Sequence, residues 1–184
     1  MDKFYTMKIA GLERTLPICP LNDKVYIAGF VMFSDVELTV AAAKELIKKV
    51  PKHDVIVTAE SKGIPLAYEM ARQLNEKYIV ARKMTKLYMQ SPIHVEVKSI
   101  TTEKLQMLYL DSAEADYLTG KRVLIIDDVI STGESLNALE TLVNSAGGQI
   151  VGKAAVLAEG DAADRKDIIY LEKLPLFDAE GNVL

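Results

Sequence analysis

Several residue types are scarce in this chain of 184 residues, which has one cysteine, two histidines and no tryptophan. Cys19 has no partner for an internal disulfide, so we expect a reducing compartment and a packed cysteine rather than a nucleophile. His53 and His94 lie far apart, without cysteine or acidic residues at metal-ligand spacing, so no zinc-site pattern is present. No run of about 18 apolar residues occurs, and we expect no membrane-spanning helix.

Neither sign of charge is in large excess. The chain has 22 lysine and arginine residues against 26 acidic ones, a net charge of −4, which favours neither nucleic acid nor an anionic membrane as partner. The first residues, 1–5, lack an apolar signal core, so we expect a cytoplasmic protein. A hydrophobic content of 49% is ordinary for a globular protein, and the length suffices for one domain with a sizeable core.

Strands and helices are predicted to alternate along the chain. Apolar runs predict strands at residues 26–33, 54–59, 78–82, 121–127 and 149–158. Helical spacing of apolar residues predicts helices at 36–50, 64–74 and 136–146. Residues 95–100 and 106–110 are expected to form β-ribbon arms, and 161–167 a polar turn or short helix. This order predicts an α/β fold with a mostly parallel, twisted sheet flanked by helices, in which ligands bind at the carboxyl ends of strands.

The segment 123–135 holds the most informative pattern. An apolar strand leads into Asp127 and Asp128, and a loop rich in hydroxyl groups and glycine then precedes a helix. Loop amides and the helix N-terminus favour a bound anion. Hydroxyl donors come from Ser131, Thr132 and Ser135, and Gly133 lets the backbone approach the anion closely. Because the two carboxylates can accept hydrogen bonds from sugar hydroxyls, the pattern predicts a phosphate site beside a sugar site.

This segment resembles the signature with which type I phosphoribosyltransferases bind 5-phosphoribosyl 1-pyrophosphate (PRPP). In that family two acidic residues and two apolar residues precede a loop of the form Ser/Thr/Ala-Thr-Gly-x-Ser/Thr. The resemblance implies a 5-phosphate site made by Ser131, Thr132, Gly133, Glu134 and Ser135. It also implies the type I phosphoribosyltransferase fold as a single domain over residues 1–184. A small hood over the base would come from residues 1–35 and 157–184, beside a flexible β-hairpin.

Two further loops follow strands at the same edge of the expected sheet. Residues 59–65 resemble the pyrophosphate loop of adenine and xanthine phosphoribosyltransferases, which implies pyrophosphate binding by Glu60, Ser61, Lys62 and Gly63. Arg82, Lys83 and Lys86 resemble the Arg-Lys-x-x-Lys segment of the same enzymes, which binds pyrophosphate in part across a dimer interface. Residues 98–104 correspond to the flexible hairpin. Its Glu103 is expected to act in catalysis together with Asp127 and Asp128.

The resemblance to the adenine and xanthine branches covers roughly residues 30–177. Hypoxanthine-guanine enzymes carry an aspartate near N7 of the purine where this chain has Ser131. The Phe-Arg-Asp segment of adenine enzymes is Phe33-Ser34-Asp35 here, so the arginine is missing. The residues expected to bind the base are Phe33, Ser34, Val129 and Leu157.

Taken with the resemblance, these motifs indicate a purine salvage enzyme of the glycosyltransferase class that converts adenine and PRPP to AMP and pyrophosphate. Mg²⁺ is the expected cofactor and bridges pyrophosphate and ribose oxygens, while Asp127 and Asp128 act on the ribose and, through water, on the metal. The substrates are the expected partners, in a homodimer. Two alternatives stay open: a xanthine or other 6-oxopurine phosphoribosyltransferase, and a non-catalytic PRPP-sensing regulatory protein.

Overall fold

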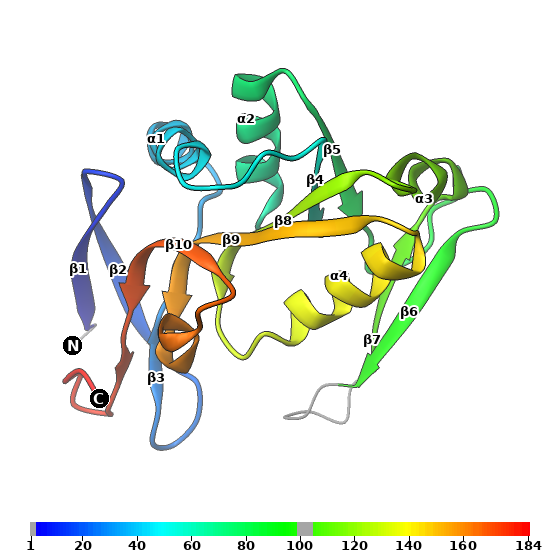
Figure 1. Cartoon of the computed structure of the whole chain (residues 1–184). Helices are drawn as coiled ribbons and strands as arrows, with labels where there is room; N and C mark the ends of the chain where they lie inside the picture. Colours follow the sequence, from blue (N-terminus) through cyan, green and yellow to red (C-terminus); the bar gives the residue numbers. More distant parts are fainter. Residues whose placement is uncertain (1–2, 99–104) are drawn as a thin grey trace.

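A five-stranded parallel sheet forms the centre of the computed structural model, which describes residues 3–98 and 105–184 (Figure 1). Its strands, in spatial order, are β10 (Ile169–Leu174), β9 (Gln149–Glu159), β8 (Arg122–Ile130), β4 (Val55–Ala59) and β5 (Lys77–Ala81). Every neighbouring pair in this sheet is parallel. The predicted α/β fold class is therefore confirmed, although β10 was not among the predicted strands.

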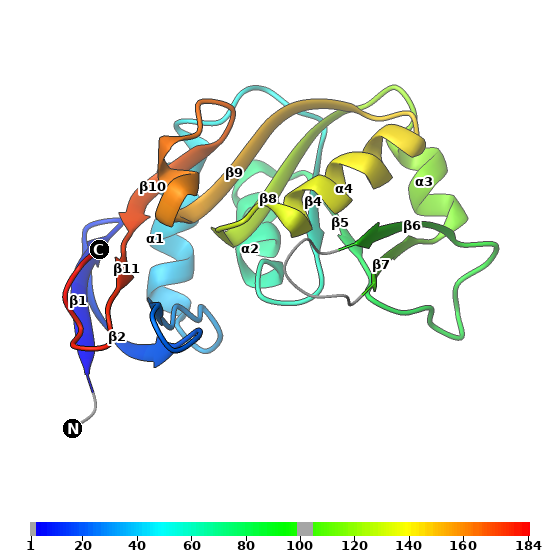
Figure 2. The same cartoon turned by 90° about the horizontal axis from the view of Figure 1, so that it is seen from below.

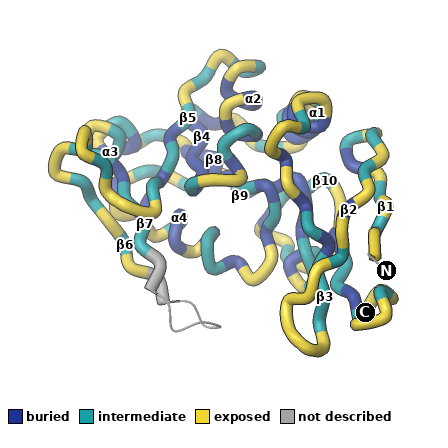
Figure 3. Tube along the Cα trace, turned by 180° about the vertical axis from the view of Figure 1, so that it is seen from behind, coloured by how far each residue is buried: buried dark blue, intermediate teal, exposed yellow. Residues whose placement is uncertain are grey.

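Helices cover both faces of the parallel sheet (Figure 1). On one face lie α1 (Val36–Ile47) and α2 (Ile64–Leu74), and on the other lie α4 (Glu134–Ser145) and the short α3 (Ser112–Leu118). Val55 and Val57 on β4 belong to the core beneath α4, whereas Ile56 between them belongs to the core beneath α1 and α2. The central strands are therefore buried on both faces, and this explains their continuous apolar sequence. Figure 3, coloured by the burial of each residue, shows buried residues along these strands.

A second, antiparallel sheet lies beyond β10. Its strand order is β1 (Phe4–Ile9), β2 (Leu12–Pro20), β3 (Tyr26–Ala28) and β11 (Leu176–Phe177), and we call it the hood sheet. Only Pro175 separates β10 from β11, so the chain passes directly from the parallel sheet into the hood sheet. Figure 2 shows this sheet at one end of the molecule. Of the segments expected to contribute to the hood over the base, residues 157–174 end β9, form the 3₁₀ helix η1 (Gly160–Asp164) and form β10.

A β-hairpin lies at the other end of the molecule (Figure 2). Its strands, β6 (Ile93–Lys98) and β7 (Leu105–Leu110), are antiparallel, as predicted for the ribbon arms. Backbone hydrogen bonds in both directions between Arg82 and Tyr109, 2.9 and 2.8 Å long, tie the hairpin to the segment after β5. The predicted catalytic Glu103 falls in residues 99–104, outside the described part of the chain.

Two local expectations were wrong. Cys19 is exposed on β2 rather than packed, because it lies on the outer face of a hairpin that is buried on one side only. The strand expected to end at Asp127 continues to Ile130, so both aspartates lie within β8. No helix in residues 3–98 or 105–184 has the length and apolar character needed to cross a membrane.

Candidate active site

A cavity of about 600 Å³ opens at the carboxyl ends of β4, β8 and β9. One part of its wall is polar and includes Glu60, Ser61, Lys62, Lys83, Asp127, Asp128, Ser131, Ser135 and Glu159. Another part is apolar and includes Val129, Leu174 and residues 27–31. Residues 27–31 begin within β3 and continue past its end. The cavity thus combines a charged region with an apolar region, as a ligand with an anionic and an aromatic part would require.

The two aspartates of β8 have different surroundings. The Asp128 side chain is almost fully buried, and its backbone N–H donates a 2.9 Å hydrogen bond to Asp127 Oδ1. Burial, followed by the neighbouring charge of Asp128, raises the pKa of Asp127 to about 7. Lys62 Nζ lies 2.9 Å from Asp128 Oδ2, as an ion pair without the alignment of a hydrogen bond. The pair therefore concentrates negative charge at the cavity floor, with one lysine to balance it.

The loop 60–63 approaches these aspartates because residue 63 is glycine. A Cβ at Gly63 would lie 3.1 Å from Asp127 Oδ1 and would clash with the hydroxyl of Thr58. Any side chain there would push the loop away from the carboxylates. Gly63 also caps α2, and the peptide bond between Glu60 and Ser61 is cis. The close approach allowed by Gly63 holds Lys62 over Asp128 in the cavity wall, with half of its side chain exposed.

Glu60 links this loop to the cationic segment after β5. Its carboxylate accepts a 3.1 Å hydrogen bond from the backbone N–H of Lys83, and it lies 3.4 Å from Arg82 Nη2 and 4.0 Å from Lys86 Nζ. The Lys83 hydrogen bond, with smaller effects from the nearby cations, lowers the pKa of Glu60. The structure thus brings together all the residues expected to bind pyrophosphate. Arg82 and Lys86 pair with Glu60 and are not among the residues that line the cavity.

The loop from Ser131 to Ser135 forms a small adjoining cavity of about 50 Å³ between the end of β8 and the start of α4. Gly133 has a φ of +83°, a left-handed conformation that favours glycine. A Cβ at this position would lie 2.6 Å from Arg165 Nη1. Asp167 holds the Arg165 guanidinium through two hydrogen bonds of 2.9 and 2.8 Å. The loop therefore offers amides and hydroxyls with a fixed cation beside them, which suits a bound phosphate.

Only one of the four residues expected to bind the base lines the cavity. Val129 does so, whereas Leu157 is fully buried in the core. Phe33 and Ser34 line a separate groove of about 240 Å³ over α1 and α2. Asp35, which caps α1 and pairs with Arg14 at 2.6 Å, anchors the chain there. The apolar wall of the main cavity is formed instead by residues 27–31 and Leu174.

Glu159 is a cavity residue that the sequence analysis missed. It is the last residue of β9 and lines the main cavity. Burial raises its pKa, and the charge of Lys62 partly opposes that effect. A signal was present in the sequence, because Glu159 directly follows a predicted strand, and ligands bind at the carboxyl ends of parallel strands.

A parallel sheet whose carboxyl edge gathers a phosphate loop, an acidic pair and a cationic loop defines a protein of the type I phosphoribosyltransferase fold. The chain belongs to the phosphoribosyl transferase domain family, whose sequence pattern matches residues 33–178. The expected family is therefore confirmed.

Individual relatives carry different names. A hypoxanthine/guanine phosphoribosyltransferase of Methanotorris igneus is 34% identical over 160 residues, covering 82% of this chain and 83% of that protein. The purine biosynthesis transcriptional repressor PurR of Bacillus subtilis is 33% identical over 113 residues, covering 61% of this chain but only 39% of the repressor. The crystal structure of adenine phosphoribosyltransferase from Thermoanaerobacter pseudethanolicus superimposes with a TM-score of 0.66 at 25% identity, covering 77% and 84% of the two chains.

Proposed function

We propose that the protein is a Mg²⁺-dependent purine phosphoribosyltransferase that converts adenine and PRPP to AMP and pyrophosphate. The observation that supports this best is one cavity lined by Lys62, the acidic pair, residues of the phosphate loop and an apolar wall. Those parts match the charged and aromatic parts of the two substrates. The same arrangement would suit a purine other than adenine, so the choice of base needs separate support.

In this proposal the loop 131–135 binds the 5-phosphate through backbone amides and hydroxyl groups. Asp127 and Asp128 accept hydrogen bonds from the two ribose hydroxyls. Lys62 and Lys83 bind the pyrophosphate, while Arg82 and Lys86 add positive charge behind it. Lys62 pairs with Asp128 at 2.9 Å, so binding of the pyrophosphate by Lys62 would require it to leave that carboxylate.

Displacement of pyrophosphate at the anomeric carbon passes through a transition state with oxocarbenium character, as in glycoside chemistry. The protein accelerates such a step mainly by positioning the reactants and by stabilising the charge on the departing pyrophosphate. The carboxylates of Asp127 and Asp128 lie on the ribose side, and their negative charge stabilises a positively charged sugar ring. Neither needs to attack as a nucleophile.

The donor set also fits Mg²⁺. In residues 3–98 and 105–184, no cluster of three or more histidine, cysteine or acidic side chains is arranged to hold a metal ion. Mg²⁺ commonly keeps several waters and uses one or two carboxylates together with substrate phosphates, so a third protein ligand is not required. Asp127 and Asp128 would hold the ion through water, and the ion would neutralise charge on the pyrophosphate when bound.

We also propose a homodimer. Arg82 and Lys86 precede an apolar stretch in which Leu87 and Tyr88 are exposed, and exposed apolar patches of this kind favour an interface. A two-fold interface would bury this patch against its own copy. It would also direct a lysine of one subunit towards the pyrophosphate of the other, so that the complete site would need both subunits.

Adenine is supported by the uncharged Ser131 at the position where hypoxanthine-guanine enzymes carry aspartate, and by the similarity to a solved adenine enzyme. The similarity to the hypoxanthine/guanine enzyme of Methanotorris igneus favours a 6-oxopurine as second candidate. The similarity to PurR favours a PRPP-binding regulator as third.

The test is a panel of adenine, hypoxanthine, guanine and xanthine with PRPP and Mg²⁺, followed by release of pyrophosphate. Adenine is expected to give the highest kcat/KM, and reactions without base or with a chelator serve as controls. A higher value for a 6-oxopurine would replace adenine in the proposal. No turnover with any base, together with calorimetric binding of PRPP, would identify a sensor instead of an enzyme.

A further inference from the structure

The proposed reaction leaves one requirement without a residue, because the purine must lose a proton as it joins the sugar. The structure contains a carboxylate near the apolar wall of the cavity. We propose that Glu159 faces the base and accepts this proton during transfer. This inference rests on the proposed function and assigns a role to a residue that the sequence motifs do not include.

The position of Glu159 follows from the strand register. On one side Ala158 pairs with Ile130 of β8, so Glu159 lies beside Ser131. On the other side Glu159 itself pairs with Leu174 of β10. All three residues, Ser131, Glu159 and Leu174, line the main cavity. Glu159 thus lies where the phosphate loop meets the apolar wall, which is where a base attached to the sugar must lie.

The surroundings of Glu159 leave its carboxylate available for a ligand. Within residues 3–98 and 105–184 it has neither a hydrogen-bond nor an ion-pair partner, although it is partly buried. An acidic side chain desolvated in a cleft without a partner is a common feature of functional sites. The other ionisable residues that line the cavity are Glu60, Lys62, Lys83, Asp127 and Asp128. Of these, Lys62 is the one whose charge acts on Glu159.

Glu159 can supply what Ser131 lacks. Ser131 lines the cavity beside Glu159, but a serine hydroxyl cannot take a full proton at neutral pH. Glu159 lies on the neighbouring strand at the level of Ser131, and its carboxylate can accept a proton.

N9 of the purine forms a bond to the anomeric carbon while the bond from that carbon to pyrophosphate breaks, and its electron pair leaves with the pyrophosphate. The proton on N7 of the purine passes to an oxygen of Glu159.

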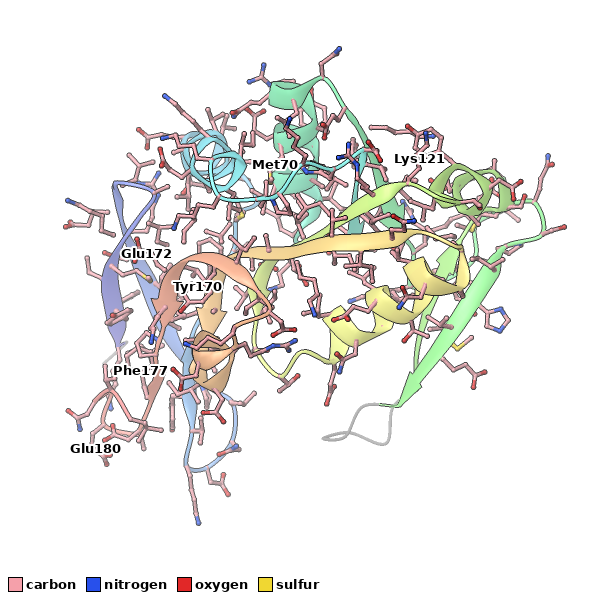
Figure 4. The ribbon with its side chains drawn as sticks, in the orientation of Figure 1. Met70, Lys121, Tyr170, Glu172, Phe177 and Glu180 are labelled. Carbon is pink, nitrogen blue, oxygen red and sulfur yellow. The ribbon has the colours of Figure 1, made fainter. Side chains whose placement is uncertain are left out.

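Glu159→Gln tests the inference because it keeps the size and polarity of the side chain but cannot accept the proton. General base catalysis typically contributes at least about 100-fold, so we expect kcat to fall by about that factor. Affinity for PRPP with Mg²⁺, measured by calorimetry, is expected to stay within about threefold of wild type. The matched control is Glu172→Gln, an exposed glutamate on β10 at the outer edge of the parallel sheet (Figure 4). Its kinetics are expected to equal those of wild type.

The pH profile separates a proton acceptor from a residue that merely shapes the cavity. The protonated form of Glu159 cannot accept a proton, so the wild-type rate is expected to rise with pH through the pKa of Glu159, which burial places above its usual value. Glu159→Gln should lose the part of the acidic limb that Glu159 contributes, while the part set by Asp127, whose pKa is about 7, remains in both proteins. A variant that keeps wild-type kcat and the same profile would overturn the inference. So would a variant whose loss is confined to PRPP affinity.

A binding experiment keeps the inference testable if the proposed function fails. Titration of the protein with adenine in the presence of Mg²⁺ and pyrophosphate cannot lead to reaction. If the wild type turns over no purine, the proposed function fails. A loss of adenine affinity of about tenfold or more in Glu159→Gln, but not in Glu172→Gln, would still place Glu159 at the base. Equal affinities in the two variants would overturn that placement.

Discussion

Replacing Asp127 by asparagine is expected to stabilise the folded protein at neutral pH while it removes activity. In the folded protein burial and the charge of Asp128 raise the pKa of Asp127 from 3.8 to about 7. Between these two pH values the unfolded chain has released the proton while the folded protein still holds it. Stability contributed by this group is therefore lost as the pH rises from about 4 to about 7, and it stays lost above that range.

The magnitude follows from the size of the pKa change. One pKa unit corresponds to about 1.4 kcal/mol, so the rise at Asp127 lowers the free energy of unfolding by about 4 kcal/mol above neutral pH. Asparagine has nearly the same shape and no charge to desolvate. The variant should therefore be more stable than wild type by about this amount at about pH 8.5, and by only about 1 kcal/mol at about pH 4.5.

Urea denaturation at these two pH values measures the effect. The midpoint should shift between wild type and Asp127→Asn at the higher pH, with an unchanged m-value, because the surface exposed on unfolding stays the same. Asp116→Asn, at an exposed position of α3, serves as the control and should shift neither midpoint. If wild type and Asp127→Asn differ equally at both pH values, ionisation of Asp127 is not the cause and the reasoning fails.

Three further predictions concern turnover, binding and assembly. Replacing both Asp127 and Asp128 by asparagine should abolish turnover of PRPP while circular dichroism stays unchanged, and near wild-type turnover would contradict their assigned role. Gly133→Val should abolish PRPP binding in calorimetry, because residue 133 has a φ of +83° and its Cβ would lie 2.6 Å from Arg165 Nη1. Unchanged affinity would mean that the phosphate binds elsewhere. Mixing inactive Lys86→Ala with inactive Asp127→Asn should restore part of the activity, since a heterodimer keeps one intact shared site. A fully active monomer in sedimentation, or a dimer without complementation, would refute that shared site.

The parallel sheet was predictable because its inner strands are apolar on both faces. The segments Val55–Val57 and Val123–Ile126 give unbroken apolar runs that a sequence displays directly. The hairpin of β1 and β2 was missed because only one of its faces is buried and Pro17 and Pro20 interrupt β2. The seven-residue α3 is too short for helical periodicity, although Asp111 and Glu114 form a capping box that the sequence contains.

The charged part of the site was predictable because its residues are close together in the sequence. Its loops are contiguous motifs, and each directly follows a strand of the same sheet. The apolar wall was not predictable, because it depends on pairing between distant parts of the chain. Ile27 comes to lie next to Leu176 through the antiparallel pairing of β3 with β11. Leu174 lines the cavity at the end of β10, two residues before Leu176. No local pattern near either residue indicates the contact.

The hood sheet joins strands from the first and last parts of the chain, and this affects the order in which the site can form during synthesis. β8 and the phosphate loop are complete before β10 and β11 leave the ribosome. Ile27 pairs with Cys19 of β2 early in the chain, but its second strand neighbour arrives only when Leu176 pairs with it. A nascent chain can therefore assemble its anion site well before its apolar wall. A premature stop ahead of Leu176 would leave a protein with a phosphate loop but without the closed pocket for an aromatic ring.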